Sequence, residues 1–182
     1  IDSHIIKALN QEVYRRYCNQ RSNVDLYGGR VMSEKGFWNL VRDNCPVNMH
    51  RVENSVMRGM PDVHYIRNGQ SGWIELKYLA NWPSKRFASG LMLNQMMWNK
   101  QYREQGGNSW VLIRIGKEFT ALLADAEALY GKPTIQEFMN LLTWFHAGNF
   151  KEENWEELAQ NLMKKETIKV SGKNIINFQE RA

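Results

Sequence analysis

The sequence has little of what marks a secreted or membrane-embedded protein. Only two of its 182 residues are cysteines, Cys18 and Cys45. They lack Cys-x-x-Cys or histidine spacing, so neither a disulfide framework nor a zinc site is indicated. No apolar run approaches the roughly 20 residues that span a bilayer, and the first residues lack a basic segment followed by a hydrophobic signal core. We therefore expect a cytoplasmic protein with reduced thiols and no membrane partner.

Further absences reduce the number of functional classes to which the protein could belong. The sequence contains no internal repeat, no low-complexity segment and no glycine-rich phosphate loop of the kind that suggests ATP use. It does contain 43% hydrophobic residues, enough for the packed core of one domain. Its 24 Lys+Arg exceed its 19 Asp+Glu, which gives a formal charge of +5. This modest excess suits a protein that binds phosphates.

A short hairpin is the most informative local pattern. Two β-favouring runs, VHYI and WIEL, flank a glycine-containing turn at residues 67–72 and predict antiparallel strands. Because side chains alternate along a strand, Glu75 and Lys77 share one face. Pairing back from the turn places Asp62 opposite residues 75–77, on that same face. Two carboxylates and an ammonium group are therefore expected to converge.

This combination has the chemistry of phosphodiester hydrolysis. Mg²⁺ prefers oxygen ligands and is commonly held by one or two carboxylates together with phosphate oxygens. Lys77 would orient an attacking water or stabilise the charge that builds on the phosphate. The residues alone also allow a simpler interpretation, in which Glu75 and Lys77 belong to a solvated strand face and Asp62 is a turn residue after proline.

The order of residues around the hairpin resembles the PD-(D/E)xK nuclease superfamily and, within it, the virus-type replication–repair nuclease (VRR-NUC) domain carried by many phages. The resemblance covers about residues 32–123. Its features are a Ser-Glu pair at 33–34 that opens a helix, NMHRVENS at 48–55, GMPD at 59–62, ELK at 75–77 and Gln95 on the next helix. It implies a restriction-endonuclease-like α/β core, with a central mixed β-sheet flanked by helices.

The resemblance also assigns roles. It implies the catalytic residues Asp62, Glu75, Lys77, Glu34 and Gln95. Of these, Asp62, Glu75 and Glu34 would bind Mg²⁺ or Mn²⁺, and Gln95 would lie near the metal or the scissile phosphate. Without the resemblance, Glu34 is a first-turn glutamate behind the N-cap Ser33, favoured by the helix dipole, and Gln95 is a surface amide.

Other polar residues near the motif are weaker candidates. Glu53 is close in sequence to Asp62, but a polar residue at a strand end explains it equally well. His64 shares the face of Asp62 by parity, and His50 precedes it on another strand. A lone strand histidine is more often a satisfied or exposed side chain than a base.

Basic residues around the motif are candidates for contact with DNA. The residues expected to bind DNA are Arg51, Arg58, Lys85, Arg86 and Trp82. The cations would neutralise phosphates, while Trp82 or Phe87 would stack on an unpaired base or wedge a junction. The alternative is a surface loop that contains a buried tryptophan.

The chain divides into three expected regions. These are an N-terminal helical segment at 1–29, the nuclease core at 30–124, and a mainly helical C-terminal extension at 125–182 with a terminal hairpin. In the extension, Thr134 and Glu137 predict a capping box at the start of a helix. A helix pair and hairpin there suit a winged DNA-binding appendage, a lid over the core or a dimer contact.

The resemblance predicts a metal-dependent DNA endonuclease of phage replication, recombination or repair, acting in the host cytoplasm. Branched DNA of the Holliday-junction type is the favoured substrate, because small relatives in this superfamily cut four-way junctions as dimers. A symmetric junction needs two cuts, which suits a homodimer. The alternatives are a flap, nick or restriction-type nuclease on the same residues, a non-catalytic DNA-binding accessory protein, and an RNA-processing nuclease.

Overall fold

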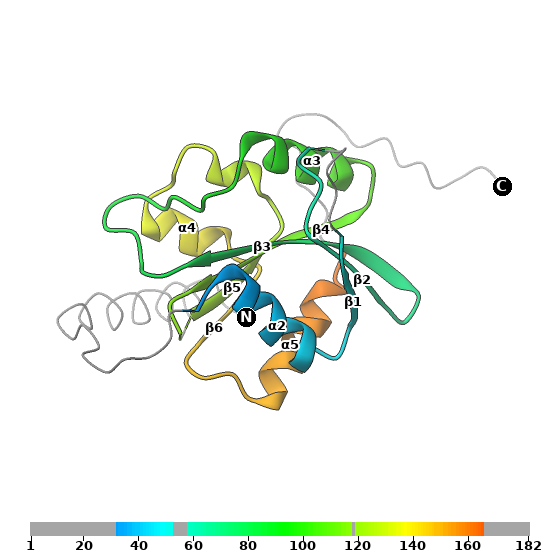
Figure 1. Ribbon diagram of the computed structural model, residues 1–182. Helices are drawn as coiled ribbons and strands as arrows, with labels where there is room; N and C mark the ends of the chain where they lie inside the picture. The colour runs from blue at the N-terminus through cyan, green and yellow to red at the C-terminus, as the bar shows by residue number, and fades with distance from the viewer. Residues whose placement is uncertain (1–31, 53–57, 118, 166–182) are drawn as a thin grey trace.

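The computed structural model describes residues 32–52, 58–117 and 119–165 (Figure 1). The expected N-terminal helix, Glu53 and the terminal hairpin lie outside the described residues. Within the described ranges, no helix is long and apolar enough to cross a membrane.

A mixed six-stranded sheet forms the centre of the protein, with its strands side by side in chain order. The strands are β1 (Asn48–Arg51), β2 (Val63–Arg67), β3 (Gln70–Leu79), β4 (Asn108–Ile115), β5 (Phe119–Leu123) and β6 (Trp144–Ala147). All neighbours are antiparallel except β3 and β4. This pair is parallel because the chain between them crosses over through a helix, as parallel strands require. The predicted α/β core with a central mixed sheet is confirmed.

Helices cover both faces of the sheet (Figure 1). The helices are α2 (Glu34–Asn44), α3 (Leu93–Glu104), α4 (Ile135–Leu141) and α5 (Glu152–Leu162), with a short 3₁₀ turn at Glu127–Leu129. Helices α2 and α5 pack against one face in one core cluster, and α3 and α4 pack against the other face in a second. Strand β4 is buried along its whole length, as expected for the central apolar run.

Elements within residues 125–165 belong to this same core. Strand β6 pairs with β5 at the sheet edge, and α5 contributes Trp155, Leu158 and Leu162 to the cluster that also holds residues of α2. The predicted capping box is present, since Glu137 N donates to Thr134 Oγ1 at 3.2 Å and Thr134 N donates to Glu137 Oε2 at 2.7 Å. Residues 125–165 therefore complete the sheet and its covering layers.

The turn between β2 and β3 sets the register that matters for the site. Asn68 and Gly69 both have positive φ, 52° and 76°, as a two-residue type I′ hairpin turn requires. The resulting ladder pairs Arg67 with Gln70 and Val63 with Ile74. The next step of this ladder aligns Asp62 with Glu75.

The glycine of the GMPD segment brings this loop against α3. Gly59 has φ +92°, and a Cβ at this position would lie 2.6 Å from the carbonyl carbon of Asn94 and overlap its oxygen. No other residue type permits so close an approach between two stretches of backbone. Gly59 thus places the segment leading to Asp62 beside the first turn of α3.

Replacing Gly59 by alanine should therefore destabilise the protein strongly. Gly90 is the matched control, because it also has positive φ (+75°) but a Cβ added there would have nothing within 4 Å. We expect Gly90→Ala to cost about 1 kcal/mol for its backbone conformation. Gly59→Ala should cost at least about 1 kcal/mol more, because of the overlap with Asn94. Urea denaturation measures both, and equal costs would contradict the close contact.

Candidate active site

Strand β3 carries two residues of the predicted catalytic group on one face. Glu75 and Lys77 lie two residues apart, on the side that α3 covers, while Ile74 and Leu76 enter the opposite core. Lys77 Nζ lies 2.7 Å from Glu75 Oε1. The Glu75 side chain is 4% exposed and that of Lys77 15% exposed, so this ion pair is largely shielded from water.

Asp62 joins this pair from the end of β2. Its carbonyl accepts a hydrogen bond from Val52 N at 2.8 Å, which continues the β1–β2 ladder by one step and fixes the backbone at this point. Asp62 is half-buried, and, after burial itself, its negative charge is the main cause of the raised pKa of the Glu75 carboxyl. The predicted convergence of Asp62, Glu75 and Lys77 is therefore present.

Gln95 is held between its own helix and the carboxylate. Gln95 Oε1 accepts a hydrogen bond from Met92 N at 3.0 Å, at the start of α3. Its Nε2 donates to Glu75 Oε1. Gln95 is thus part of the site and not a free surface amide, because the start of α3 lies directly over Glu75.

Glu34 lies at the margin of the site. It is the first residue of α2, and the N-cap role predicted for Ser33 is confirmed, since Gly36 N donates to Ser33 Oγ at 3.2 Å. The charge of Glu34 contributes to the raised pKa of both Glu75 and Lys77. Among the described residues, however, no three acidic, histidine or cysteine side chains gather closely enough to hold a metal ion together. The described structure therefore does not bring Glu34 together with Asp62 and Glu75 as a set of three metal ligands.

Burial and charge give Glu75 unusual electrostatics. Burial raises its pKa to about 7, the negative charge of Asp62 adds to the rise, and Lys77 partly offsets it. For Lys77, burial lowers the pKa, but the neighbouring carboxylates, Glu75 above all, outweigh burial and raise it. Lys77 therefore remains a cation, while Glu75 exchanges its proton near neutral pH.

The donor set fits a hard divalent cation. Glu75 Oε2 is buried and has no hydrogen-bond partner within residues 32–52, 58–117 and 119–165, although a buried carboxylate oxygen normally has one. With the Asp62 carboxylate on the adjacent strand, it offers two oxygen ligands. Mg²⁺ needs only one or two carboxylates, because water and substrate phosphate complete its octahedral shell. Asp62 and Glu75 are the residues that would hold such an ion.

The predicted DNA-binding residues fall into two groups. Arg51, Arg58 and Lys85 are exposed on the surface. Arg86 is also exposed, but its guanidinium donates to the carbonyl of Lys132 at 3.1 Å, which ties this loop to the residues before α4.

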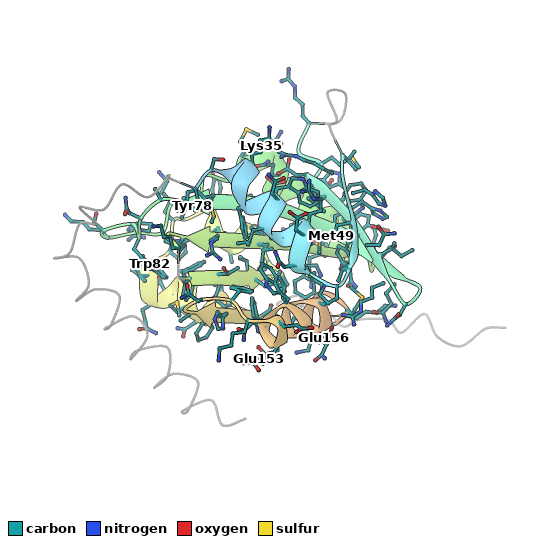
Figure 2. The ribbon with its side chains drawn as sticks, turned by 60° about the horizontal axis from the view of Figure 1, so that its bottom comes forward. Lys35, Met49, Tyr78, Trp82, Glu153 and Glu156 are labelled. Atoms are coloured by element: carbon teal, nitrogen blue, oxygen red, sulfur yellow. The ribbon has the colours of Figure 1, made fainter. Side chains whose placement is uncertain are left out.

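Trp82 is half-buried and packs on other rings, which favours the alternative of a structural tryptophan in this loop, and its stacking on DNA bases stays a prediction. Its ring packs against Phe119 and Phe138, with centroids 4.8 and 6.3 Å apart, and Figure 2 shows Trp82 beside α4. Phe87 is fully buried and stacks on Phe138 at 3.6 Å. These rings fill the core between the sheet and α4, because an apolar surface there is more stable away from water.

Sequence reasoning missed a row of rings next to the carboxylates. His64 lies 4.9 Å from Trp73 between centroids, and Trp73 lies 5.9 Å from Trp98. Trp98 stacks on Tyr102 at 4.7 Å. The spacing in the sequence could have indicated this row. Trp73 stands two residues before Glu75, on the same strand face, and Trp98 and Tyr102 lie three and seven residues after Gln95, on the same side of the helix.

Comparisons with known proteins give a sparse result. No family model matches the chain, and no curated protein matches it. Among solved structures, it is similar to Hjc, a Holliday junction resolvase from the archaeal hyperthermophile Archaeoglobus fulgidus. The match has 16% identity and a TM-score of 0.34, and covers 48% of this chain and 74% of that chain. Any function must therefore be supported by the site residues themselves.

The raised pKa of Glu75 predicts how stability changes with pH in the metal-free protein. Unfolding returns the pKa from about 7 to its ordinary value of 4.5. Between these values the folded state holds a proton that the unfolded state has lost, so the free energy of unfolding falls as pH rises. The fall should reach about 3 kcal/mol, since one pKa unit corresponds to about 1.4 kcal/mol.

Denaturation with urea in EDTA, from pH 4.5 to pH 8, measures this effect. Glu75→Gln should remove the fall, whereas Glu157→Gln, at an exposed position on α5, should retain it. If Glu75→Gln and wild type show the same pH dependence, the site does not perturb Glu75 as described.

Proposed function

We propose that this protein is a Mg²⁺- or Mn²⁺-dependent DNA endonuclease of the PD-(D/E)xK superfamily, of the VRR-NUC type, that cuts branched DNA. The observation that carries the proposal is the buried contact of Lys77 with Glu75, beside Asp62, with one Glu75 oxygen that has no hydrogen-bond partner among the described residues. Two carboxylates and a lysine in this arrangement supply the groups that metal-assisted phosphodiester hydrolysis needs.

Each residue has a definable part in this reaction. A bound divalent ion would neutralise charge on the phosphate and lower the pKa of a water. Asp62 and Glu75 would hold that ion, and Gln95 keeps the Glu75 carboxylate in place through its hydrogen bond. Lys77, held as a cation by the carboxylates around it, would orient the attacking water or stabilise the negative charge on the phosphate oxygens.

The substrate and the setting rest on the resemblance of the sequence motifs. DNA would run past the site with its phosphates near Arg51, Arg58 and Lys85, whose exposed side chains would neutralise them. A homodimer would place two equal sites on a four-way junction, as two symmetric cuts require. We place the protein in the cytoplasm, and in that of the host if a phage encodes it.

Cleavage assays test the proposal directly. Four-way-junction, flap and linear duplex DNA are incubated with Mg²⁺, Mn²⁺ or EDTA. Wild type should make paired cuts in the junction, and it should do so only when a metal is present. Asp62→Asn should lower the rate at least about a hundredfold, because it weakens the metal site. Its affinity for DNA in EDTA should stay within about twofold of wild type.

Asp43→Asn is the matched control, since Asp43 is an exposed carboxylate at the far end of α2 from Glu34. It should cut like wild type. Equal cutting by wild type and Asp62→Asn would overturn the assignment of the site. Binding of DNA without any cutting would favour a non-catalytic DNA-binding protein instead.

A further inference from the structure

The row of rings described above continues the catalytic face of the sheet. Asp62 aligns with Glu75, and two residues further along each strand His64 pairs with Trp73. Since a strand advances about 3.4 Å per residue, the second pair lies roughly 7 Å from the first on the same face. The rings of His64 and Trp73 therefore stand next to the carboxylates and not in a separate region.

Helix α3 supplies the other side of this row. Trp98 and Tyr102 follow Gln95 by three and seven residues, so all three share one side of the helix. Trp98 and Tyr102 stack nearly parallel, with an interplanar angle of 12°. Gly107 permits this position of Tyr102, because a Cβ at Gly107 would lie 2.7 Å from Cζ of the tyrosine ring.

These rings are only partly removed from water. His64, Trp73, Trp98 and Tyr102 are all half-buried, whereas the core rings of Tyr65, Trp110 and Phe119 are fully buried. None of the first four belongs to either core cluster. On the same face of the sheet Ile66 is 42% exposed and His50 is exposed. Helix α3 thus leaves the β1–β2 side of this face open.

Half-buried aromatic rings beside the proposed phosphodiester-binding site suit the bases of nucleic acid. Stacking of bases on aromatic side chains is sequence-tolerant, because every base has a flat π-face, but it requires a base that is not already paired within a duplex. The exposed Arg58 lies in the loop that leads to Asp62, where it would contact a phosphate of the same strand, whereas Arg51 pairs with Val63 and so belongs to the opposite face of the sheet.

We propose that the aromatic row of His64, Trp73, Trp98 and Tyr102 binds an unpaired base next to the scissile phosphate. This inference rests on the proposed function and specifies its substrate class as branched DNA in which a nucleotide beside the cut is unpaired, as in a flap or fork or at the opened branch point of a junction. Trp73 is the central residue, since it contacts both His64 and Trp98. The row then selects branched or frayed DNA over continuous duplex.

A binding assay in EDTA tests this without any cutting. The probes are a fluorescently labelled forked DNA with unpaired nucleotides at its branch, the same fork with abasic nucleotides at those positions, and a continuous duplex. The full chain is used as wild type and as Trp73→Leu, which keeps an apolar side chain but removes the ring. Trp144→Leu is the matched control, because Trp144 is a half-buried tryptophan on β6 that packs against Phe150.

For the fork, Trp73→Leu should weaken binding by about tenfold, within the range expected when one base–aromatic stack is lost. Wild type should bind the abasic fork about tenfold more weakly than the normal fork. Trp73→Leu should bind the two forks almost equally, because removing the ring and removing the base abolish the same contact. Duplex binding should be unchanged in Trp73→Leu, and Trp144→Leu should bind all three probes like wild type.

Three results would overturn the inference. They are equal binding of the normal and abasic forks by wild type, an equal loss of fork and duplex binding in Trp73→Leu, and the same loss in Trp144→Leu. The comparison of the two forks uses wild type alone, so it decides the matter even if a variant folds poorly. If the binding pattern is as expected but no metal supports cutting, the nuclease proposal fails while the base-binding row stands.

Discussion

The buried contact between Lys77 and Glu75 is the interaction that holds the whole site together. A carboxylate shielded from water is costly unless an opposite charge and hydrogen bonds compensate it. Lys77 Nζ at 2.7 Å and the amide of Gln95 both compensate one oxygen, Oε1, while Oε2 has no hydrogen-bond partner in the part of the chain that the structure describes. Burial and the charge of Asp62 outweigh this compensation and raise the pKa of Glu75 to about 7, and its second oxygen is available to a cation.

Several local features serve to hold this contact in place. The type I′ turn at Asn68 and Gly69 sets the register that aligns Asp62 with Glu75. Gly59 allows the loop before Asp62 to pack against the backbone of α3. The crossover through α3, which makes β3 and β4 parallel, carries Gln95 back over the same strand. Each is a feature of the backbone outside the Lys77–Glu75 contact itself, yet each helps to determine where a carboxylate lies.

The same face combines two kinds of surface. Where Asp62 aligns with Glu75, this face presents carboxylates and a lysine. Two residues further along each strand, where His64 pairs with Trp73, it presents half-buried rings. Phosphodiester chemistry needs the first, and recognition of an exposed base needs the second. Because both steps lie on one rigid strand pair, a substrate held by its base would have its phosphate in a fixed position relative to Glu75. Such positioning reduces the entropic part of a reaction barrier.

Features that depend on local backbone geometry could be predicted from the amino-acid order alone. Alternation along a strand put Glu75 and Lys77 on one face, and spacing was enough to identify the cap at Ser33 and the capping box of Thr134 with Glu137. The meeting of distant segments, in contrast, required the folded structure. Folding packed Trp82 against the core, included α5 and β6 in the main fold, and brought Gln95 to Glu75 from 20 residues away. Burial of Glu75, and with it the raised pKa, depends on this packing, because desolvation is a property of the whole surroundings of a side chain and not of its neighbours in sequence.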